Sequence, residues 1–440
     1  MTRSDSALTE TANHVIPQEE RIRLSNEWHA RPGLRQAPPM RCSHVVSLRN
    51  ESTVDQARAE FARFCRKHDA SPPPEGSRQH NVRIGSCQVK WEGHTEAVSH
   101  TVMVPGNGQP PFSETALGLL DREKRDALVA DFLVGVHIEV LPSPGQEDPH
   151  GHSLASSLLA SQTLHGGLMS AGHAAVWSAF QLDANGFLRI VVIDLSIPEG
   201  RLSRLLQRIL EIESYRMLAM MALPRARQAM ADLGRMEPEL NRVMINLEQE
   251  RSEADQEAAL AAITGIAASV EQIVSTHAYR FAAARAYASI VERRLEEVGE
   301  EKIGGYQSYT NFLLRSLQPA MRTCDATERR ANELAQRVAR AANLLNTMVD
   351  MVQKKQNQAL LQSMDERAYM QLRLQQAVEG FSIFAISYYA VGLLGYGFKA
   401  MKSVGLPVDA TLLTGIASPL VFALVWVLVR SVRRRLTKHD

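Results

Sequence analysis

Two long uncharged runs close to the C-terminus constrain this chain more than any other feature. They read GFSIFAISYYAVGLLGYGF over residues 380–398 and ATLLTGIASPLVFALVWVLV over residues 410–429. Each has about the 20 apolar residues that an α-helix needs to cross the hydrocarbon core of a bilayer. Because only 11 residues separate the runs, we expect residues 379–430 to form a transmembrane hairpin. The alternative interpretation is a pair of buried core helices.

The charges around this hairpin predict its orientation. Residues 431–440 include three consecutive arginines, whereas the linker between the runs carries Lys399 and Lys402. Positively charged flanks favour the cytoplasmic side, so we expect a basic cytoplasmic tail over residues 431–440. A hairpin returns the chain to the side from which it came, so the N-terminal part is expected in the cytoplasm too. Residues 1–20 are polar, do not resemble a secretory signal, and are expected to be disordered.

The segment before the first run is a candidate for one very long helix. It contains no Gly or Pro between Ala320 and Glu379. If this helix continues into the apolar run, it spans over seventy residues and, at about 1.5 Å per residue, more than about 100 Å. Helices of this length pack as bundles or coiled coils. We therefore expect residues 199–378 to form a long-helix bundle or stalk.

The N-terminal part has a different sequence pattern. Short segments of alternating apolar and polar residues are separated by Pro and Gly. HAAVWSAFQL and FLRIVVIDL flank the turn sequence DANG, which predicts a β-hairpin. The apolar spacing within residues 51–68 and 114–132 predicts two amphipathic helices. We interpret residues 21–198 as a cytoplasmic mixed α/β domain, so that the whole chain belongs to the α+β class.

The overall composition excludes several functions. The 49 Lys and Arg nearly cancel the 48 Asp and Glu, so no basic surplus favours nucleic acid as a partner. The four cysteines are scattered without a CxxC pair, which gives neither a zinc site nor a disulfide framework. The expected partners are instead the lipid bilayer and further copies of the chain.

Three segments of the N-terminal domain place His and Glu two residues apart. In a strand, side chains two residues apart share a face, so NEWHARP, VKWEGHTEAV and VHIEV would each present a polar pair, with Val89, Trp91 and Ala97 on the opposite face of the second segment. If these strands are neighbours, their polar side chains form a cluster. The candidate ligand or metal residues are Glu27, His29, Arg31, Glu92, His94, Glu96, His137 and Glu139.

Such a cluster has three interpretations. It could bind a divalent metal ion or another ligand through imidazole nitrogen and carboxylate oxygen. It could perform acid–base chemistry, because a carboxylate beside a histidine tunes its pKa. It could also be a structural network of ion pairs and hydrogen bonds. The cation of Arg31 favours the structural interpretation, since a positive charge next to a metal site is unfavourable. Beyond a divalent metal, the sequence indicates no cofactor.

The first apolar run contains a polar stripe. Ser382, Tyr389 and Tyr396 are seven residues apart and therefore lie near one line along a helix. These residues, with Gly397 and Lys399, are candidates for lining a pore between several copies of the chain, since one hairpin cannot enclose a pore. Alternatively, the hydroxyl groups bond to neighbouring helices and Tyr396 belongs to an interfacial aromatic belt. In a ring of copies, Lys399 would oppose cations and suit anions.

Several long motifs resemble a bacterial family known as domain of unknown function 3422, whose members are described as membrane-anchored. The matching stretches include LSNEWHARP (24–32), WEGHTEA (91–97), LLQRILEIESYRMLAMMALPRAR (205–227), LQPAMRTC (317–324) and QNQALLQSMDERAYMQLRLQQAVEGFSIFAISYY (356–389). This resemblance implies a multi-pass protein of the bacterial inner membrane and supplies no activity.

The layout also resembles the CorA-type magnesium channels. Those channels combine a cytoplasmic α/β domain, a very long helix that enters the first span, a short external loop, a second span and a basic tail. They end the first span with Tyr-Gly-Met-Asn, of which Tyr396 and Gly397 match whereas Phe398 and Lys399 do not. A shared architecture by itself does not establish a function.

These observations support three hypotheses on function. The first is an oligomeric inner-membrane ion channel or transporter of CorA-like architecture. The second is a membrane-anchored cytoplasmic sensor or scaffold that binds a ligand or metal on the His/Glu face. The third, ranked well below, is a membrane-tethered hydrolase that uses His29, His94 and nearby carboxylates, so we expect a non-enzyme over an enzyme.

Overall fold

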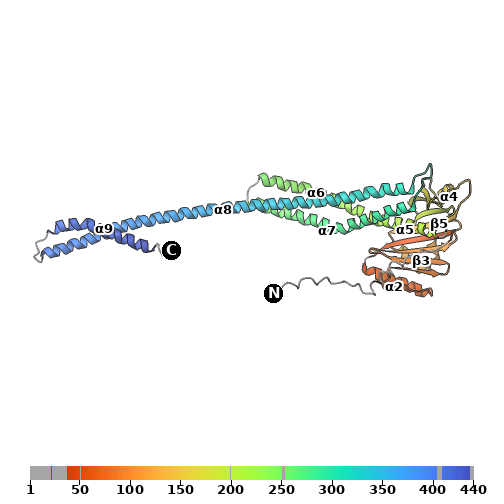
Figure 1. Ribbon diagram of the computed structural model, residues 1–440, viewed down its shortest axis with the longest axis horizontal. Helices are drawn as coiled ribbons and strands as arrows, with labels where there is room; N and C mark the ends of the chain where they lie inside the picture. Colours follow the sequence, from red (N-terminus) through yellow and green to blue (C-terminus); the bar gives the residue numbers. More distant parts are fainter. Residues whose placement is uncertain are drawn as a thin grey trace, which may run out of the picture. The chain divides into compact units, whose positions relative to one another are not determined.

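The computed structural model describes residues 21, 37–49, 51–198, 200–249, 253–403 and 409–436, which form an α+β protein (Figure 1). The chain divides into two compact units, Met1–Arg340 and Ala341–Asp440. The first contains the sheet and most of the long helices, and the second contains the rest of the longest helix and the last one.

An eight-stranded mixed sheet organises the first unit. Its strand order is β2-β3-β4-β1-β5-β8-β7-β6. Only the pairing of β5 with β8 is parallel, and the other pairs are antiparallel. The strands are β1 (Met40–Leu48), β2 (Gln79–Ile84), β3 (Cys87–Gly93), β4 (Ala97–Pro105), β5 (Val134–Pro142), β6 (His165–Met169), β7 (Ala174–Leu182) and β8 (Leu188–Asp194).

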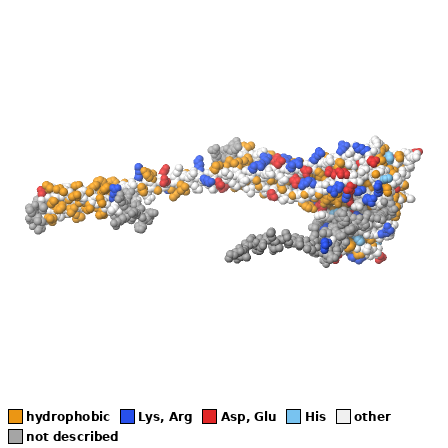
Figure 2. Space-filling model, in the orientation of Figure 1, with side chains coloured by type: hydrophobic (Ala, Val, Ile, Leu, Met, Phe, Trp, Pro, Cys, Tyr) orange, Lys and Arg blue, Asp and Glu red, His pale blue; other side chains and the backbone are white. Residues whose placement is uncertain are grey.

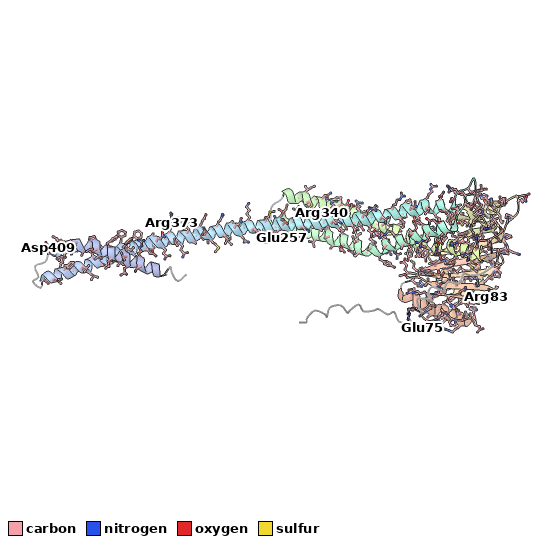
Figure 3. The ribbon with its side chains drawn as sticks, viewed as in Figure 1. Glu75, Arg83, Glu257, Arg340, Arg373 and Asp409 are labelled. Atoms are coloured by element: carbon pink, nitrogen blue, oxygen red, sulfur yellow. The ribbon has the colours of Figure 1, made fainter. Side chains whose placement is uncertain are left out.

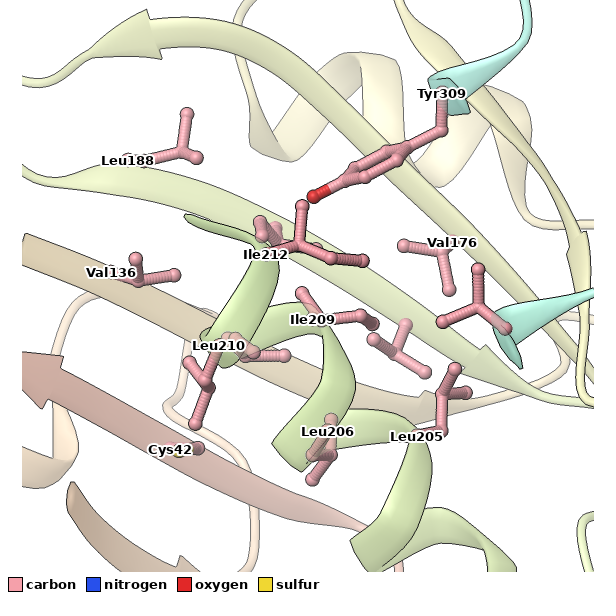
Figure 4. Close-up of a cluster of buried hydrophobic side chains, with 14 of the residues drawn as sticks. Cys42, Val136, Val176, Leu188, Leu205, Leu206, Ile209, Leu210, Ile212 and Tyr309 are labelled. Carbon is pink, nitrogen blue, oxygen red and sulfur yellow. The ribbon is translucent and has the colours of Figure 1, made fainter. Parts of the chain in front are cut away.

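One face of the sheet packs against helix α5 (Arg201–Met220). Leu205, Leu206 and Ile209 of this helix are buried against Val136 and Val176 of the central strands (Figure 4). Burying a side chain of this size contributes about 1.5–3 kcal/mol. Since β1, β4 and β5 are also covered on their other face, nearly all of their residues are buried, including polar ones such as His44, Thr101 and His137.

The opposite face is covered by shorter helices. Helix α2 (Glu51–Lys67) stacks Phe61 on Trp91 with ring centroids 6.1 Å apart, and helix α4 (His152–Leu158) packs near Trp177. The predicted single helix over 114–132 was wrong. The structure has a short 3-10 helix, η1 (Ala116–Leu119), and a separate α3 (Arg122–Val129), because the Asp121 side chain accepts from the backbone N–H of Lys124 and caps α3.

Four long helices follow the sheet. They are α5, α6 (Ala222–Gln249), α7 (Glu253–Val298) and α8 (Tyr309–Ser403). Helix α7 packs along α5 and α6, and the first turns of α8 join the core of the first unit through Leu313 and Leu317. The predicted continuous helix is confirmed, since α8 has 95 residues. The predicted hairpin around DANG is also confirmed as β7 and β8, as is the helix at the position of α2.

The start of α8 is held by a carboxylate. Glu300 accepts hydrogen bonds from the backbone N–H groups of Tyr309 and Thr310 and from the hydroxyl of Ser308, at 2.7–2.8 Å. These are donors that a helix N-terminus otherwise leaves unsatisfied, and a negative charge there is favourable. The Tyr309 hydroxyl also donates to the buried Glu213 of α5 at 2.8 Å.

The second unit consists of the later part of α8 and helix α9 (Ala410–Leu436). The two helices pair antiparallel, because Phe384 contacts Phe422 and Gly395 lies beside Thr414. Arg373 precedes the apolar part of α8, and Asp409 caps α9 through the N–H groups of the next residues (Figure 3). Hydrophobic side chains dominate the surface of α9 and of the part of α8 beside it (Figure 2).

Candidate functional site

A cavity of about 650 Å³ lies between the sheet and helices α5 and α7. Its floor is the α5-facing side of β1, β3 and β4, and its walls are the two helices. Most of its lining side chains carry a charge, a hydroxyl group or another polar group. The polar lining residues are His44, Arg78, Gln79, Lys90, Glu92, His94, Thr95, Ser99, Thr101, Ser203, Gln207, Glu211, Ser214, Tyr215, Tyr287, Arg293 and Arg294.

An ion pair forms part of the floor. Lys90 is buried, and its Nζ lies 2.8 Å from Oε1 of Glu92. Burial by itself would raise the pKa of Glu92, but the charge and the hydrogen bond of Lys90 outweigh it and the pKa lies below its usual value. The Glu92 carboxylate therefore stays ionised at neutral pH, and Lys90 brings a cation to the base of the cavity.

A neutral histidine lies beside this pair. Burial lowers the pKa of His44 to about 4, so the ring carries a single N–H at pH 7. Nδ1 of His44 is 2.8 Å from the Thr101 hydroxyl, and Nε2 is 3.0 Å from the hydroxyl of Ser214, which itself donates to the Leu210 carbonyl. Every partner is satisfied when Thr101 donates to Nδ1 and Nε2–H donates to Ser214.

This Ser–His pair differs from a catalytic one in two respects. An activated serine donates its proton to the histidine, whereas Ser214 donates to a backbone carbonyl. The other ring nitrogen of His44 faces the hydroxyl of Thr101 and not a carboxylate that could stabilise an imidazolium. The geometry thus fits a hydrogen-bonded floor better than a nucleophile.

The helical walls combine ion pairs with stacked aromatic rings. Arg294 of α7 pairs with Glu211 of α5 at 2.5 Å. Tyr215 of α5 stacks on Tyr287 of α7 with ring centroids 5.5 Å apart. Burial raises the pKa of Tyr287, and its hydrogen bond to Glu96 adds to that effect. These contacts hold α5 and α7 together around the cavity.

The structure brings the second predicted segment to this cavity but changes its form. Glu92 and His94 line the cavity, and Glu96 forms two hydrogen bonds with Arg280 of α7 at 2.9 and 2.5 Å. The segment is not one strand: β3 ends at Gly93, β4 begins at Ala97, and the His94 N–H donates to the Ala97 carbonyl between them. Because the chain turns between β3 and β4, the alternation of side chains between the two faces of the sheet does not continue from one strand to the next.

As a result, Ala97 and Trp91 do not share a face, contrary to our expectation. Ala97 belongs to the core below α5, whereas Trp91 belongs to the core below α2. The three residues of the turn place His94 beside Tyr215, so its position depends on the turn and not on strand alternation.

The third predicted pair lies elsewhere. His137 and Glu139 are on β5, three strands from β3, and face the opposite side of the sheet. Nδ1 of His137 is 2.8 Å from the Ser43 hydroxyl, and its ring stacks on Phe187. Glu139 accepts the backbone N–H of Phe112 at 3.0 Å. Both residues therefore hold neighbouring segments of the fold in place.

The cluster expected from all three segments is thus divided by the sheet. The first segment, with Glu27, His29 and Arg31, lies outside the described residues. Among the residues that the structure does describe, no three His, Cys, Asp or Glu side chains come together as a metal site would require. The sequence also missed His44, Lys90 and Tyr287, since only the strand order and the packing of α7 place them at the cavity.

The candidate membrane residues lie together on α8. Ser387 is buried on the side that packs against α9, whereas Tyr389 and Tyr396 are on the opposite side of the helix and exposed. Ser382 is also exposed, and it lies near Val429 of α9. Tyr389 and Tyr396 are 71% and 74% exposed. Gly397 has no atom near the position that a Cβ would take, and Lys399 lies 5.8 Å from the centroid of the Tyr396 ring.

Three described helices are long and apolar enough to cross a membrane by length and composition. They comprise Ala254–Val298 in α7, Tyr309–Met401 in α8 and Ala410–Ser431 in α9. Each of these helices has a most apolar stretch of 18 residues. The buried share of that stretch is 22% in α7, 6% in α8 and 0% in α9. The sequence analysis identified the second and third but not the first.

The fold and the cavity thus define an α+β protein with a polar site beneath two helices and a long helical extension. The model of the family described as Protein of unknown function (DUF3422) matches residues 17–436. Since this match covers nearly the whole chain, the protein belongs to that family. A search of curated proteins finds no match to the chain.

Proposed function

We propose that this protein is a homo-oligomeric ion channel or transporter of the bacterial inner membrane, in which α8 and α9 are the spans and α8 lies innermost. One observation carries the proposal. Ser382, Tyr389 and Tyr396 repeat every seven residues along α8, and all are exposed in the single chain. Tyr389 and Tyr396 lie on the side opposite Ser387, and Ser382 lies near Val429 of α9. A second exposed row consists of Ala385, Gly392 and Lys399, each three residues after a member of the first row.

The spacing of these rows favours packing with other copies. Alternating steps of three and four residues are the pattern by which parallel helices associate. Small residues at such a seam let helices approach closely, and hydroxyl groups in a bilayer gain from partners across the seam. Copies of α8 around an axis would provide those partners, with Tyr and Ser hydroxyls available to a hydrated path.

The charges near the spans indicate the sign of the transported ion and the orientation of the chain in the membrane. Lys399 would repeat around the outer mouth, and a ring of ammonium groups disfavours cations and favours anions. Arg430 at the end of the second apolar run, together with the basic sequence after it, supports a cytoplasmic C-terminus by the positive-inside rule. An even number of spans then returns the N-terminal part to the same side.

Cysteine cross-linking in membranes tests this arrangement. The four native cysteines are buried, so a single introduced thiol can be read directly. Tyr389→Cys and Tyr396→Cys should give disulfide-linked dimers on mild oxidation, because their counterparts lie close across the axis. Ile416→Cys, on the exposed side of α9 away from α8, is the matched control and should stay monomeric. A monomeric protein in native mass spectrometry would contradict the proposal.

A second candidate function is favoured by the cavity in the first unit. A polar site of ligand size, walled by α5 and α7, suits a membrane-anchored cytoplasmic sensor or scaffold. It predicts that occupation of the cavity changes oligomeric state or partner binding. Sedimentation of the full-length protein with and without a bound probe measures this, and identical profiles would contradict the sensor hypothesis.

A further inference from the structure

We propose that the cavity between the sheet and helices α5 and α7 binds a small organic anion that carries phosphate or carboxylate groups. This inference deepens the sensor hypothesis by naming the class of its ligand. It does not depend on whether the spans form a pore.

The charge of the lining is the first argument. Four cationic side chains line the cavity, Arg78, Lys90, Arg293 and Arg294, against two carboxylates, Glu92 and Glu211. Both carboxylates form ion pairs within the lining, with Lys90 and Arg294 respectively. The lining side chains therefore carry two more positive than negative charges. An anion would offset that surplus.

The position of Lys90 is the second argument. Its side chain is only 9% exposed, yet it borders the cavity and has three N–H donors, of which a single carboxylate oxygen at 2.8 Å can take one or two. A buried ammonium group gains more from a charged acceptor than an exposed one, because water screens it less. A ligand phosphate or carboxylate beside Lys90 would accept the hydrogen bonds that Glu92 does not accept.

The rim and the floor supply the remaining contacts. Arg293 of α7 is an exposed lining residue, and no described acid lies within ion-pair distance of it. The lining hydroxyl groups of Ser99 and Ser203 provide hydrogen-bonding groups without adding charge, whereas both ring nitrogens of His44 are bonded to Thr101 and Ser214. Hydroxyl groups of this kind suit the polar atoms of an organic ligand.

The size of the site and its aromatic wall limit the ligand further. About 650 Å³ lies within the range of pockets that hold small organic molecules, and is far more than a bare ion needs. Tyr215 and Tyr287 form a stacked pair on the wall, and such rings favour contact with a planar ligand group. A divalent cation fits poorly, because the described residues bring no three metal-binding side chains together.

The test uses the full-length protein in detergent, with thermal unfolding as the readout. The probes are inorganic phosphate, adenosine monophosphate and citrate, compared with sodium chloride at equal ionic strength and with magnesium chloride. We expect at least one anionic probe to raise the melting temperature beyond the chloride control. A larger effect of adenosine monophosphate would indicate a ligand with a planar group, and a larger effect of citrate a carboxylate ligand.

Three variants separate binding from folding. Arg293→Gln removes an exposed charge and should weaken probe binding about tenfold without lowering the melting temperature of the free protein. Glu92→Gln should strengthen binding, because it releases Lys90 from its carboxylate partner. Arg122→Gln, at a side chain that is 87% exposed in an ion pair of α3, is the matched control and should leave binding unchanged.

Each outcome decides the question. The anion proposal is wrong if no anionic probe exceeds the chloride control, or if Arg293→Gln and Glu92→Gln bind the best probe like the unaltered protein. Stabilisation by magnesium alone would also overturn it, while leaving the sensor hypothesis intact. Binding of an anion without any change in oligomeric state would instead support the site and contradict the sensor function.

Discussion

Helices α7 and α9 are both long and apolar enough to cross a bilayer. They differ in how much of their apolar surface is covered by other parts of the protein. Buried residues recur along α7 every three or four positions, including Ile263, Ile266 and Val270, and the helix packs along α5 and α6. In α9 the most apolar window has no buried share, and its partner is α8. Apolar content alone therefore does not distinguish a helix that packs on a protein core from one whose apolar side chains are exposed.

The charged residues explain the difference. Along α7, Arg280, Arg285 and Arg294 pair with acids of the β3–β4 turn, α8 and α5 respectively. The apolar part of α9 has no charged residue between Asp409 and Arg430, so it has nothing to pair with a polar surface. The proposed function requires α9, but not α7, to cross the membrane, and four predictions test that contrast.

The largest effect is expected from breaking the bond between α7 and the sheet. Arg280→Met leaves the Glu96 carboxylate, whose side chain is 11% exposed, without its cation, which should cost about 3–5 kcal/mol of unfolding free energy. Arg285→Met, in a more exposed pair of the same helix, should cost at most about 1 kcal/mol. Chemical denaturation followed by tryptophan fluorescence measures both, and equal losses would contradict the assigned role of Arg280.

Protonation of either of two buried histidines should destabilise the sheet unit nearly as strongly. Burial lowers the pKa of both His44 and His137 to about 4, whereas an unfolded histidine titrates near 6.5. The unfolded chain thus binds protons first as pH falls, so this stability is complete above about pH 6.5 and decreases toward pH 4. The loss is about 3 kcal/mol per histidine.

Denaturant unfolding at a series of pH values measures this loss. His137→Gln should flatten the dependence between pH 6.5 and 4, although losing the contact with Ser43 lowers stability at every pH. An unchanged slope in that variant would show that His137 does not contribute. The spans should contribute little, since the described part of the second unit contains no histidine.

A charge introduced into each helix compares their surroundings directly. Leu424→Arg in the middle of α9 should oppose membrane insertion by about 2.5–3.5 kcal/mol. Ala267→Arg, at an exposed position of α7, should change stability by no more than about 0.5 kcal/mol. Fractionation into membrane and soluble pools measures the first effect, and an insertion defect in Ala267→Arg would show that α7 also enters the bilayer.

The smallest effect is expected where α8 meets α9. A Cβ on Gly395 would lie 3.5 Å from the methyl carbon of Thr414, an ordinary contact. Gly395→Ala should therefore be tolerated, and the higher helix propensity of Ala could stabilise the pair by up to about 1 kcal/mol. Gly395→Leu should separate the helices. Resistance of the hairpin to detergent denaturation ranks the two variants, and equal behaviour would contradict the α8–α9 contact.

Local sequence signals predicted the parts of the fold that depend on local physics. The absence of Gly and Pro after Ala320 predicted the long helix, and DANG between two apolar segments predicted the β7–β8 hairpin. The helix over 114–132 failed because Asp121 caps a new helix in the middle of an amphipathic pattern. A strong cap within a periodic segment was the signal that could have corrected it.

The site depends on strand order, register and helix packing, which a single sequence does not reveal. Alternation shows which residues of a strand share a face, but not which face of the sheet they join. That choice depends on strand order and register, which put Glu92 below α5 and His137 below α2 and η1. Likewise, Tyr287 and Arg293 reach the cavity only through the packing of α7 on α5.

The cap that Glu300 places on α8 has a practical consequence for dissecting the protein. A fragment that stops before Tyr309 would leave Glu300 without two of its three donors, the backbone N–H groups of Tyr309 and Thr310, and Glu213 without the tyrosine hydroxyl. It would also expose the core residues against which Leu317 and Cys324 pack. A soluble fragment suited to crystallisation should therefore extend through Arg340, although that leaves part of the longest helix attached.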